Sequence, residues 1–219
     1  MERPRIVSVN VGVPRTVEWR GRSVRTGIFK DPVAGGVAVR ARNLDGDGQA
    51  DLRVHGGPDK AVYAYPAEHY EAWVEELRRE LPWASFGENL TVSGGLTEDA
   101  VHLGDRFRAG TAELVVTQPR IPCYKLGIRL GDDDVVKAFL DSRRTGFYTK
   151  VVREGVVAAG DAMERVAVDP RRIPVAEVTR AYAHDRHDLD AIRQILEVDD
   201  LAAAWREHFS KRLSVDGAR

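Results

Sequence analysis

The chain has 219 residues, of which 43% are hydrophobic and 31% charged, as is usual for a globular protein that buries a substantial core. Lysine and arginine (33) nearly balance aspartate and glutamate (34), and the net charge of -1 gives no reason to expect binding to duplex nucleic acid or to anionic membranes. No apolar run approaches the roughly 20 residues of a membrane helix, and the N-terminus has no apolar signal core, so we expect a cytoplasmic protein.

Short strands dominate the first three quarters of the sequence. β-Branched and alternating runs predict strands at residues 6–13, 23–30, 37–40, 61–65, 90–92, 101–108, 112–117, 146–153 and 156–168. Glycine and aspartate residues that favour turns separate most of these runs. Many short strands with frequent turns are typical of a β-barrel or a β-sandwich.

Helical spacing of apolar residues predicts two helices inside this region, at residues 66–81 and 133–144. After residue 169 the strand pattern stops. Helices are expected there at residues 175–183, 188–196 and 200–213, with Asp188 and Asp199 as N-caps. We therefore expect a β-domain over residues 1–169 and a three-helix domain over residues 170–219. The second domain is too small for much stability of its own, so it should pack on the β-domain or on a second subunit.

Cys123 is the only cysteine of the sequence, which excludes an internal disulfide and a zinc site made of cysteines alone. It follows a predicted strand, and Pro119 and Pro122 restrict the backbone around it. Arg120 and Lys125 would favour its thiolate, which is a nucleophile and a soft metal ligand. The alternative is a buried cysteine that acts only as a small apolar side chain.

A second candidate segment is VHGGPDK at residues 54–60. Gly56 and Gly57 allow backbone amide groups to approach an anion closely, and Lys60 adds positive charge. His55 can donate a proton near neutral pH. A tight turn between strands is the alternative interpretation.

Two further places carry residues suited to binding. In FGENL at residues 86–90, Asn89 can donate and accept hydrogen bonds to a heterocycle and Glu88 can accept them, although a polar turn explains the same residues. Lys30 ends a predicted strand, where a lysine is usually only solvated. The segment DGDGQAD at residues 45–51 looks like a calcium loop, but Ala50 replaces its essential glycine, so calcium binding is not expected.

Six motifs occur together and in order between residues 9 and 168. They are TGIFK (26–30), GDGQAD (46–51) leading into HGGPDK (55–60), YPAEHY (65–70), FGENL (86–90), LGD (103–105) and QPRIPCYK (118–125). With these motifs the chain resembles the MOSC domain family, named after the C-terminal domain of molybdenum cofactor sulfurase. Within that family it resembles the YiiM-like proteins linked to 6-hydroxylaminopurine resistance, and its tail resembles their three-helix domain.

The resemblance implies a mainly β fold with α additions, namely a MOSC-type β-barrel followed by a small three-helix C-terminal domain. It also implies a pterin-based molybdenum cofactor (molybdopterin) whose metal is ligated by Cys123. A catalytic grouping of lysine, cysteine and histidine is proposed for such proteins, and Lys30, Cys123 and His55 fit it best. The residues expected to bind the cofactor are Gly56, Gly57, Asp59, Lys60, Glu88, Asn89, Arg120 and Lys125. Pyridoxal phosphate binding is not expected.

We accordingly expect a molybdenum-cofactor-dependent oxidoreductase that detoxifies N-hydroxylated bases, such as 6-hydroxylaminopurine, and related N-oxygenated compounds. His55 is the expected proton donor, because cleavage of an N–O bond requires protonation of the leaving oxygen. The sequence has no cysteine cluster and no flavin motif, so electrons would come from a separate reductase. Two alternatives stay open: a non-catalytic carrier of sulfur or cofactor, and a metal-free cysteine enzyme. The sequence is also compatible with a homodimer.

Overall fold

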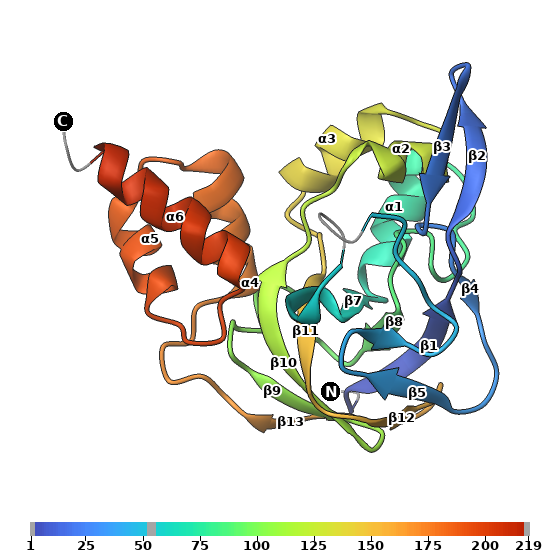
Figure 1. Ribbon diagram of the computed structural model, residues 1–219, viewed down its shortest axis with the longest axis horizontal. Helices are drawn as coiled ribbons and strands as arrows, with labels where there is room; N and C mark the ends of the chain where they lie inside the picture. The colour runs from blue at the N-terminus through green and yellow to red at the C-terminus, as the bar shows by residue number, and fades with distance from the viewer. Residues whose placement is uncertain (1–2, 52–55, 217–219) are drawn as a thin grey trace.

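An eight-stranded mixed sheet forms the centre of the protein, whose computed structural model describes residues 3–51 and 56–216 (Figure 1). In the order in which they pair, the strands are β13 (Met163–Ala167), β9 (Arg106–Ala109), β10 (Ala112–Pro119), β11 (Phe147–Arg153), β7 (Val62–Pro66), β8 (Leu90–Ser93), β1 (Arg5–Val11) and β4 (Asp31–Pro32). All neighbours are antiparallel except β7 and β8. The prediction of a mainly β fold with added helices is confirmed.

Two smaller sheets complete the β structure. One contains, in order, β12 (Gly155–Val157), β5 (Val37–Arg40) and β6 (Asn43–Leu44), and the other is the hairpin of β2 (Arg15–Trp19) and β3 (Arg22–Thr26). The hairpin turns at Arg20 and Gly21, which both have positive φ angles of 50° and 73°. Two such residues form the turn that matches the twist of antiparallel strands. The hairpin extends away from the body of the protein in Figure 1.

The prediction of a closed barrel is wrong, because the sheet has two distinct ends, β13 and β4. The outer edge of β1 is divided between two partners. Asn10 and Val11 pair with the two-residue strand β4, while Arg5 meets Ala162, just before β13, in an isolated bridge. The amide of Ile6 also donates to the carbonyl of Asp161 at 2.9 Å. The sheet therefore curls until β1 approaches β13, but no continuous ladder joins them.

Three helices accompany the sheet: α1 (His69–Leu77), α2 (Tyr124–Leu130) and α3 (Asp134–Asp141). The first and third correspond to the predicted helices at residues 66–81 and 133–144 but are shorter. Arg78 adopts the left-handed conformation at φ 52° and its amide caps α1, while Arg143, at φ 58°, lies just beyond the end of α3. Helix α2 was not predicted. These helices enclose a second, aromatic core that contains Tyr65, Tyr70, Trp73, Phe86 and Phe139.

The C-terminal region consists of α4 (Val175–Thr179), a π-helical turn η2 (Arg180–His184), α5 (Leu189–Leu196) and α6 (Ala203–Asp216). Asp188 caps α5 as predicted, since its carboxylate accepts from the amide of Ala191 at 3.0 Å. The predicted cap Asp199 precedes an α6 that begins only at Ala203. Buried residues of this region, such as Ile192, belong to the same hydrophobic cluster as residues of the main sheet. The helices therefore pack on the β region of the same chain.

Replacing Phe209 with alanine is expected to destabilise the whole protein. Phe209 lies on α6, is fully buried, and belongs to the cluster shared with the sheet. The change should lower the free energy of unfolding by about 3–5 kcal/mol. Urea unfolding followed by circular dichroism should still show one transition, at a lower midpoint. Val215→Ala on the same helix, at a 62% exposed residue, should have almost no effect. A separate early melting of the helices would contradict the shared core.

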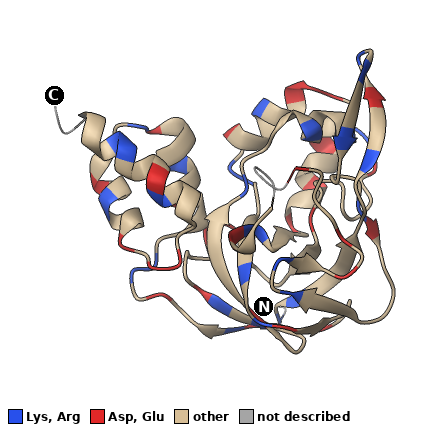
Figure 2. Ribbon diagram, viewed as in Figure 1, with Lys and Arg blue, Asp and Glu red and all other residues tan. Residues whose placement is uncertain are grey.

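Charged residues of both signs are interspersed over the ribbon rather than gathered on one element (Figure 2). Many of them pair locally, as Arg180 does with Glu177, Asp185 and Asp188. Within the part of the chain that the structure describes, no helix has the length and apolarity needed to cross a membrane.

Candidate functional site

A pocket of about 660 Å³, counting its open mouth, lies where several chain segments converge. Its wall comes from the segment after β3, the loop before the undescribed residues 52–55, η1 (Pro58–Lys60), β7, the turn before β8, the segment after β10, and β11. The lining residues are Thr26, Gly27, Ile28, Lys30, Gly48, Gln49, Ala50, Lys60, Tyr63, Phe86, Gly87, Asn89, Arg120, Ile121, Cys123, Lys125 and Tyr148.

Six of the residues predicted for the site line this pocket. They are Lys30, Lys60, Asn89, Arg120, Cys123 and Lys125. Gly56, Gly57, Asp59 and Glu88 are not among its lining residues. His55, the predicted proton donor, lies outside the described residues. Four cationic side chains and the cysteine are thus brought together from segments up to 95 residues apart, from Lys30 to Lys125.

Cys123 lies directly before α2, in an extended conformation with φ -127° and ψ 171°. Its carbonyl accepts from the amide of Leu126 at 2.9 Å, which fixes the cysteine at the start of the helix. The residue is half-buried and lines the pocket. The thiol is therefore placed for chemistry inside the pocket, in contrast to the alternative of a fully buried apolar cysteine.

Arg120, like Lys30, is a buried cation of the pocket and is only 6% exposed. Its guanidinium lies over two aromatic rings, 5.3 Å from the ring centre of Tyr63 and 5.1 Å from that of Phe139. Its Nη1 atom is buried and has no hydrogen-bond partner among the described residues. A buried guanidinium stays charged, and an unpaired donor on it is costly unless a ligand pairs with it. The side chain is therefore suited to bind an anion in the pocket.

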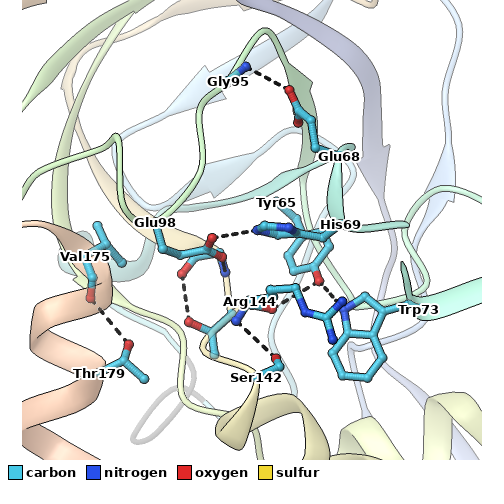
Figure 3. Close-up of polar contacts among 12 residues, drawn as sticks. Tyr65, Glu68, His69, Trp73, Gly95, Glu98, Ser142, Arg144, Val175 and Thr179 are labelled. Atoms are coloured by element: carbon cyan, nitrogen blue, oxygen red, sulfur yellow. Dashed lines mark hydrogen bonds and ion pairs between the residues drawn. The ribbon is translucent and has the colours of Figure 1, made fainter. Parts of the chain in front are cut away.

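The backbone of Arg120 is held by the turn at residues 142–146. Figure 3 shows contacts of Ser142, Arg144 and Glu98 around this turn. The Arg120 amide donates to the carbonyl of Gly146 at 3.2 Å. The amide of Gly146 in turn donates to the buried carboxylate of Glu98, which also contacts His69 at 2.6 Å. Two residues before Gly146, the carbonyl of Arg144 accepts from the hydroxyl of Tyr65 at 3.1 Å. This network fixes the backbone of Arg120 relative to the sheet.

Lys30 forms an ion pair with Asp47, whose side chain is fully buried. The same carboxylate accepts from the amide of Gly12 at 3.1 Å and from the side-chain amide of Asn89 at 2.9 Å. Burial lowers the pKa of Lys30, and the charge of Asp47 opposes this shift. Gly27 permits the approach of the two segments, because an added Cβ would lie 2.4 Å from the carbonyl oxygen of Gly48. Asp47 therefore anchors both Lys30 and Asn89.

Asp47 was missed as a site residue, although it belongs to the GDGQAD motif. The spacing of its carboxylates resembles a calcium loop, and this pattern gives no sign of an ion pair with Lys30. The order of the motifs was the available signal, since Lys30, Asp47 and Asn89 each belong to one of them.

Tyr63 and Tyr148 are two other lining residues that the sequence did not single out. They are direct partners in the ladder between β7 and β11, and their ring centres lie 5.1 Å apart. Burial raises the pKa of both hydroxyl groups, which stay neutral near pH 7. Because aromatic residues in strands usually belong to the core, the sequence held no signal for this role. Together with Phe86 they give the pocket flat, apolar walls.

Glu88 and Asp59 have partners within the protein. The carboxylate of Glu88 is fully buried, and accepts from the hydroxyl of Tyr70 and from the amides of Ala84 and Phe86. The carboxylate of Asp59 accepts from the amide of Ala203 at 3.2 Å. Among the described residues, no group of three or more histidine, cysteine, aspartate or glutamate side chains could hold a metal ion.

Comparison with known proteins identifies both parts of the chain. The family profile of the MOSC domain matches residues 51–164, and that of the YiiM-like, 3-alpha helix domain matches residues 173–215. Uncharacterized protein YflK of Bacillus subtilis (strain 168) is 45% identical over 211 residues, which make up 96% of this chain and 95% of the relative. Protein YiiM of Escherichia coli (strain K12) is 37% identical over 188 residues, or 84% of this chain and 83% of the relative.

Two further matches complete the comparison. The crystal structure of YiiM from Geobacillus stearothermophilus has a TM-score of 0.82 at 40% identity, covering 96% of this chain and 99% of that one. A protein named reductase from Gibberella moniliformis (strain M3125 / FGSC 7600) is 31% identical over 147 residues, which make up 65% of this chain but only 26% of that protein. The chain therefore belongs to the MOSC domain family, as a YiiM-like protein with a C-terminal three-helix domain.

Proposed function

We propose that the pocket binds a pterin-based molybdenum cofactor through Cys123 and that the protein reduces N-hydroxylated bases and related N-oxygenated compounds. MOSC domains are associated with molybdenum cofactor binding in general, and the relative from Gibberella moniliformis carries the name of a reductase. The observation that carries the proposal is the buried Nη1 of Arg120, which has no hydrogen-bond partner among the described residues and lies in the same pocket as the cysteine.

The residues of the pocket fit such a cofactor. A pterin cofactor presents a phosphate, a flat heterocycle and a metal that accepts thiolate. Arg120 would pair with the phosphate, supported by Lys60 and Lys125, since a guanidinium with a free donor forms strong charge-assisted hydrogen bonds. The aromatic walls suit the heterocycle. Cys123 would be the protein ligand of the metal, and the other metal ligands would come from the cofactor.

Reduction of an N–OH group to N–H consumes two electrons and two protons, breaks the N–O bond and releases water. When bound, the cofactor would supply the two electrons, which a separate donor protein replaces. The chain itself must supply a proton to the leaving oxygen. His55 remains the proposed donor, and the ammonium of Lys30, held by Asp47 on the pocket wall, would hydrogen-bond the same oxygen. Asn89, another lining residue, would orient the substrate.

Metal analysis of protein purified from a cofactor-producing host tests the proposal. The unchanged chain should contain near-stoichiometric molybdenum and should reduce 6-hydroxylaminopurine with a reduced viologen dye as electron donor. Cys123→Ala should lose both the metal and the activity. It should still bind pyrophosphate, because the cations of the pocket remain, and this control separates a lost ligand from a lost fold.

Each other outcome points elsewhere. Molybdenum that persists in Cys123→Ala would disprove ligation by the cysteine. Molybdenum without turnover, combined with its transfer to an acceptor protein, would identify a carrier instead of a reductase. If no molybdenum is found in either sample, the cofactor part of the proposal is wrong.

A further inference from the structure

The carboxylate of Asp59 joins two parts of the chain that are 144 residues apart in sequence. Asp59 belongs to η1, the short turn that also contains Lys60. Its Oδ2 accepts from the amide of Ala203, the first residue of α6, at 3.2 Å. The preceding residue, Ala202, accepts the first helical hydrogen bonds of α6 but has no polar side chain to cap it. The first amide groups of a helix need acceptors from outside the helix, and Asp59, which is remote in sequence, supplies one of them.

Strand β10 strengthens this junction through Thr117, which is fully buried. The hydroxyl of Thr117 donates to the carbonyl of Asp59 at 2.7 Å. The carbonyl of Thr117 accepts from the amide of Ala202 at 3.2 Å. The turn η1, strand β10 and the start of helix α6 are therefore linked to one another by three hydrogen bonds. Figure 1 shows the C-terminal helices beside β10 and at the end of the molecule opposite the β2–β3 hairpin.

The turn η1 and strand β10 each lead directly into the pocket. Lys60, the residue after Asp59, lines the pocket, and its amide donates to the carbonyl of Gly57 at 3.1 Å to close the turn. Arg120 follows Thr117 by three residues and also lines the pocket. We propose that Asp59 is a positioning residue through which helix α6 fixes the turn that carries Lys60, so that the three-helix region is a structural part of the pocket.

This inference gives Asp59 a different task from direct cofactor binding. One of its carboxylate oxygens is occupied by the amide of Ala203, and Asp59 is not among the residues lining the pocket. The effect on anion binding rests on the proposed function of the pocket. The coupling between α6 and the turn does not, because it concerns contacts within the chain.

Four variants test the coupling. Asp59→Ala removes the acceptor, whereas Asp59→Asn keeps an acceptor at the same place and removes only the charge. Ala203→Pro removes the donor from the other side, and proline is well tolerated at the first position of a helix. Ala203 is exposed, so the ring has room. Asp188→Ala is the matched control, because it removes the cap of α5 without touching η1 or β10.

The first measurement is hydrogen–deuterium exchange of the Lys60 amide, followed by mass spectrometry of its peptide. Asp59→Ala and Ala203→Pro should each speed this exchange roughly fivefold, the usual effect of losing a helix cap. Asp59→Asn should stay near the unchanged protein. Asp188→Ala should lower the melting temperature without affecting the Lys60 amide. The double variant Asp59→Ala/Ala203→Pro should be no worse than either single change, because both remove the same contact.

The second measurement is the affinity for inorganic pyrophosphate by titration calorimetry, which should fall by a similar, roughly fivefold factor in the same two variants. If Ala203→Pro leaves the exchange of Lys60 unchanged, or if Asp188→Ala accelerates it equally, the coupling is refuted. If the unchanged protein binds no pyrophosphate, the anion site of the proposed function fails. The exchange data still decide on the coupling in that case.

Discussion

Replacing Arg120 with methionine is expected to reduce the affinity for pyrophosphate by roughly 10- to 100-fold, as the loss of charge-assisted hydrogen bonds usually does. Arg120→Lys should restore only part of it, because an ammonium group cannot reproduce the planar fork of the guanidinium. The stability of the ligand-free protein should change by less than about 1 kcal/mol. The lost contacts with Tyr63 and Phe139 are offset by removal of a buried, unpaired donor.

Titration calorimetry measures the pyrophosphate affinity, and thermal unfolding of the same samples measures the stability. The informative feature is the contrast between a large loss of binding and a small change in stability. A residue that served only the fold would show the reverse. Unchanged pyrophosphate affinity in Arg120→Met would place the anion elsewhere and remove the main support for a cofactor phosphate at this position.

The second large effect is expected at the buried pair of Lys30 and Asp47. Asp47→Asn removes the negative charge with little change of shape and leaves the ammonium of Lys30 without its counter-ion. The free energy of unfolding should fall by about 3 kcal/mol at pH 7, as it does when one partner of a buried pair is lost. The double change Lys30→Met/Asp47→Asn should recover most of this loss, since neither side chain of the pair then carries a charge.

The pH dependence gives this prediction a second check. Burial already lowers the pKa of Lys30 in the folded protein, and loss of Asp47 should lower it further. Between the folded pKa and the higher unfolded pKa, the unfolded chain binds more protons, so stability rises with pH in that window. The destabilisation by Asp47→Asn should therefore shrink as the pH rises from 7 toward 10. Urea unfolding at several pH values measures it, and a constant difference would mean that Lys30 does not titrate.

The sequence predicts the strands of the fold better than it predicts their closure. Every predicted strand overlaps an observed one, because β-branched alternation reports directly on burial in a sheet. The run at residues 156–168 is two strands, β12 and β13, separated by a turn in which Gly160 has φ 94°. Closure depends on which strands share an edge. Asn10 and Val11 pair with the two-residue strand β4. A strand this short has no alternating pattern by which the sequence could predict the pairing.

Helix ends show a similar limit. Arg78 and Arg143 adopt positive φ values that sequence patterns assign to glycine, so the predicted helices were too long. For the site, the motifs predicted that Lys30, Lys60, Arg120 and Cys123 belong together, and all four line one pocket. The partners of those residues were not predictable in the same way. Whether a carboxylate such as that of Asp59 points into a pocket or onto a distant helix is decided by tertiary packing.

The hydrogen bond between Asp59 and Ala203 also has a consequence for biosynthesis. In synthesis from the N-terminus the pocket segments emerge before α6, while domains tend to fold as soon as they emerge. In the proposed coupling, the turn that carries Lys60 lacks the support of α6 until that helix has left the ribosome. Competence to bind an anion should therefore arise only after α6 has been made.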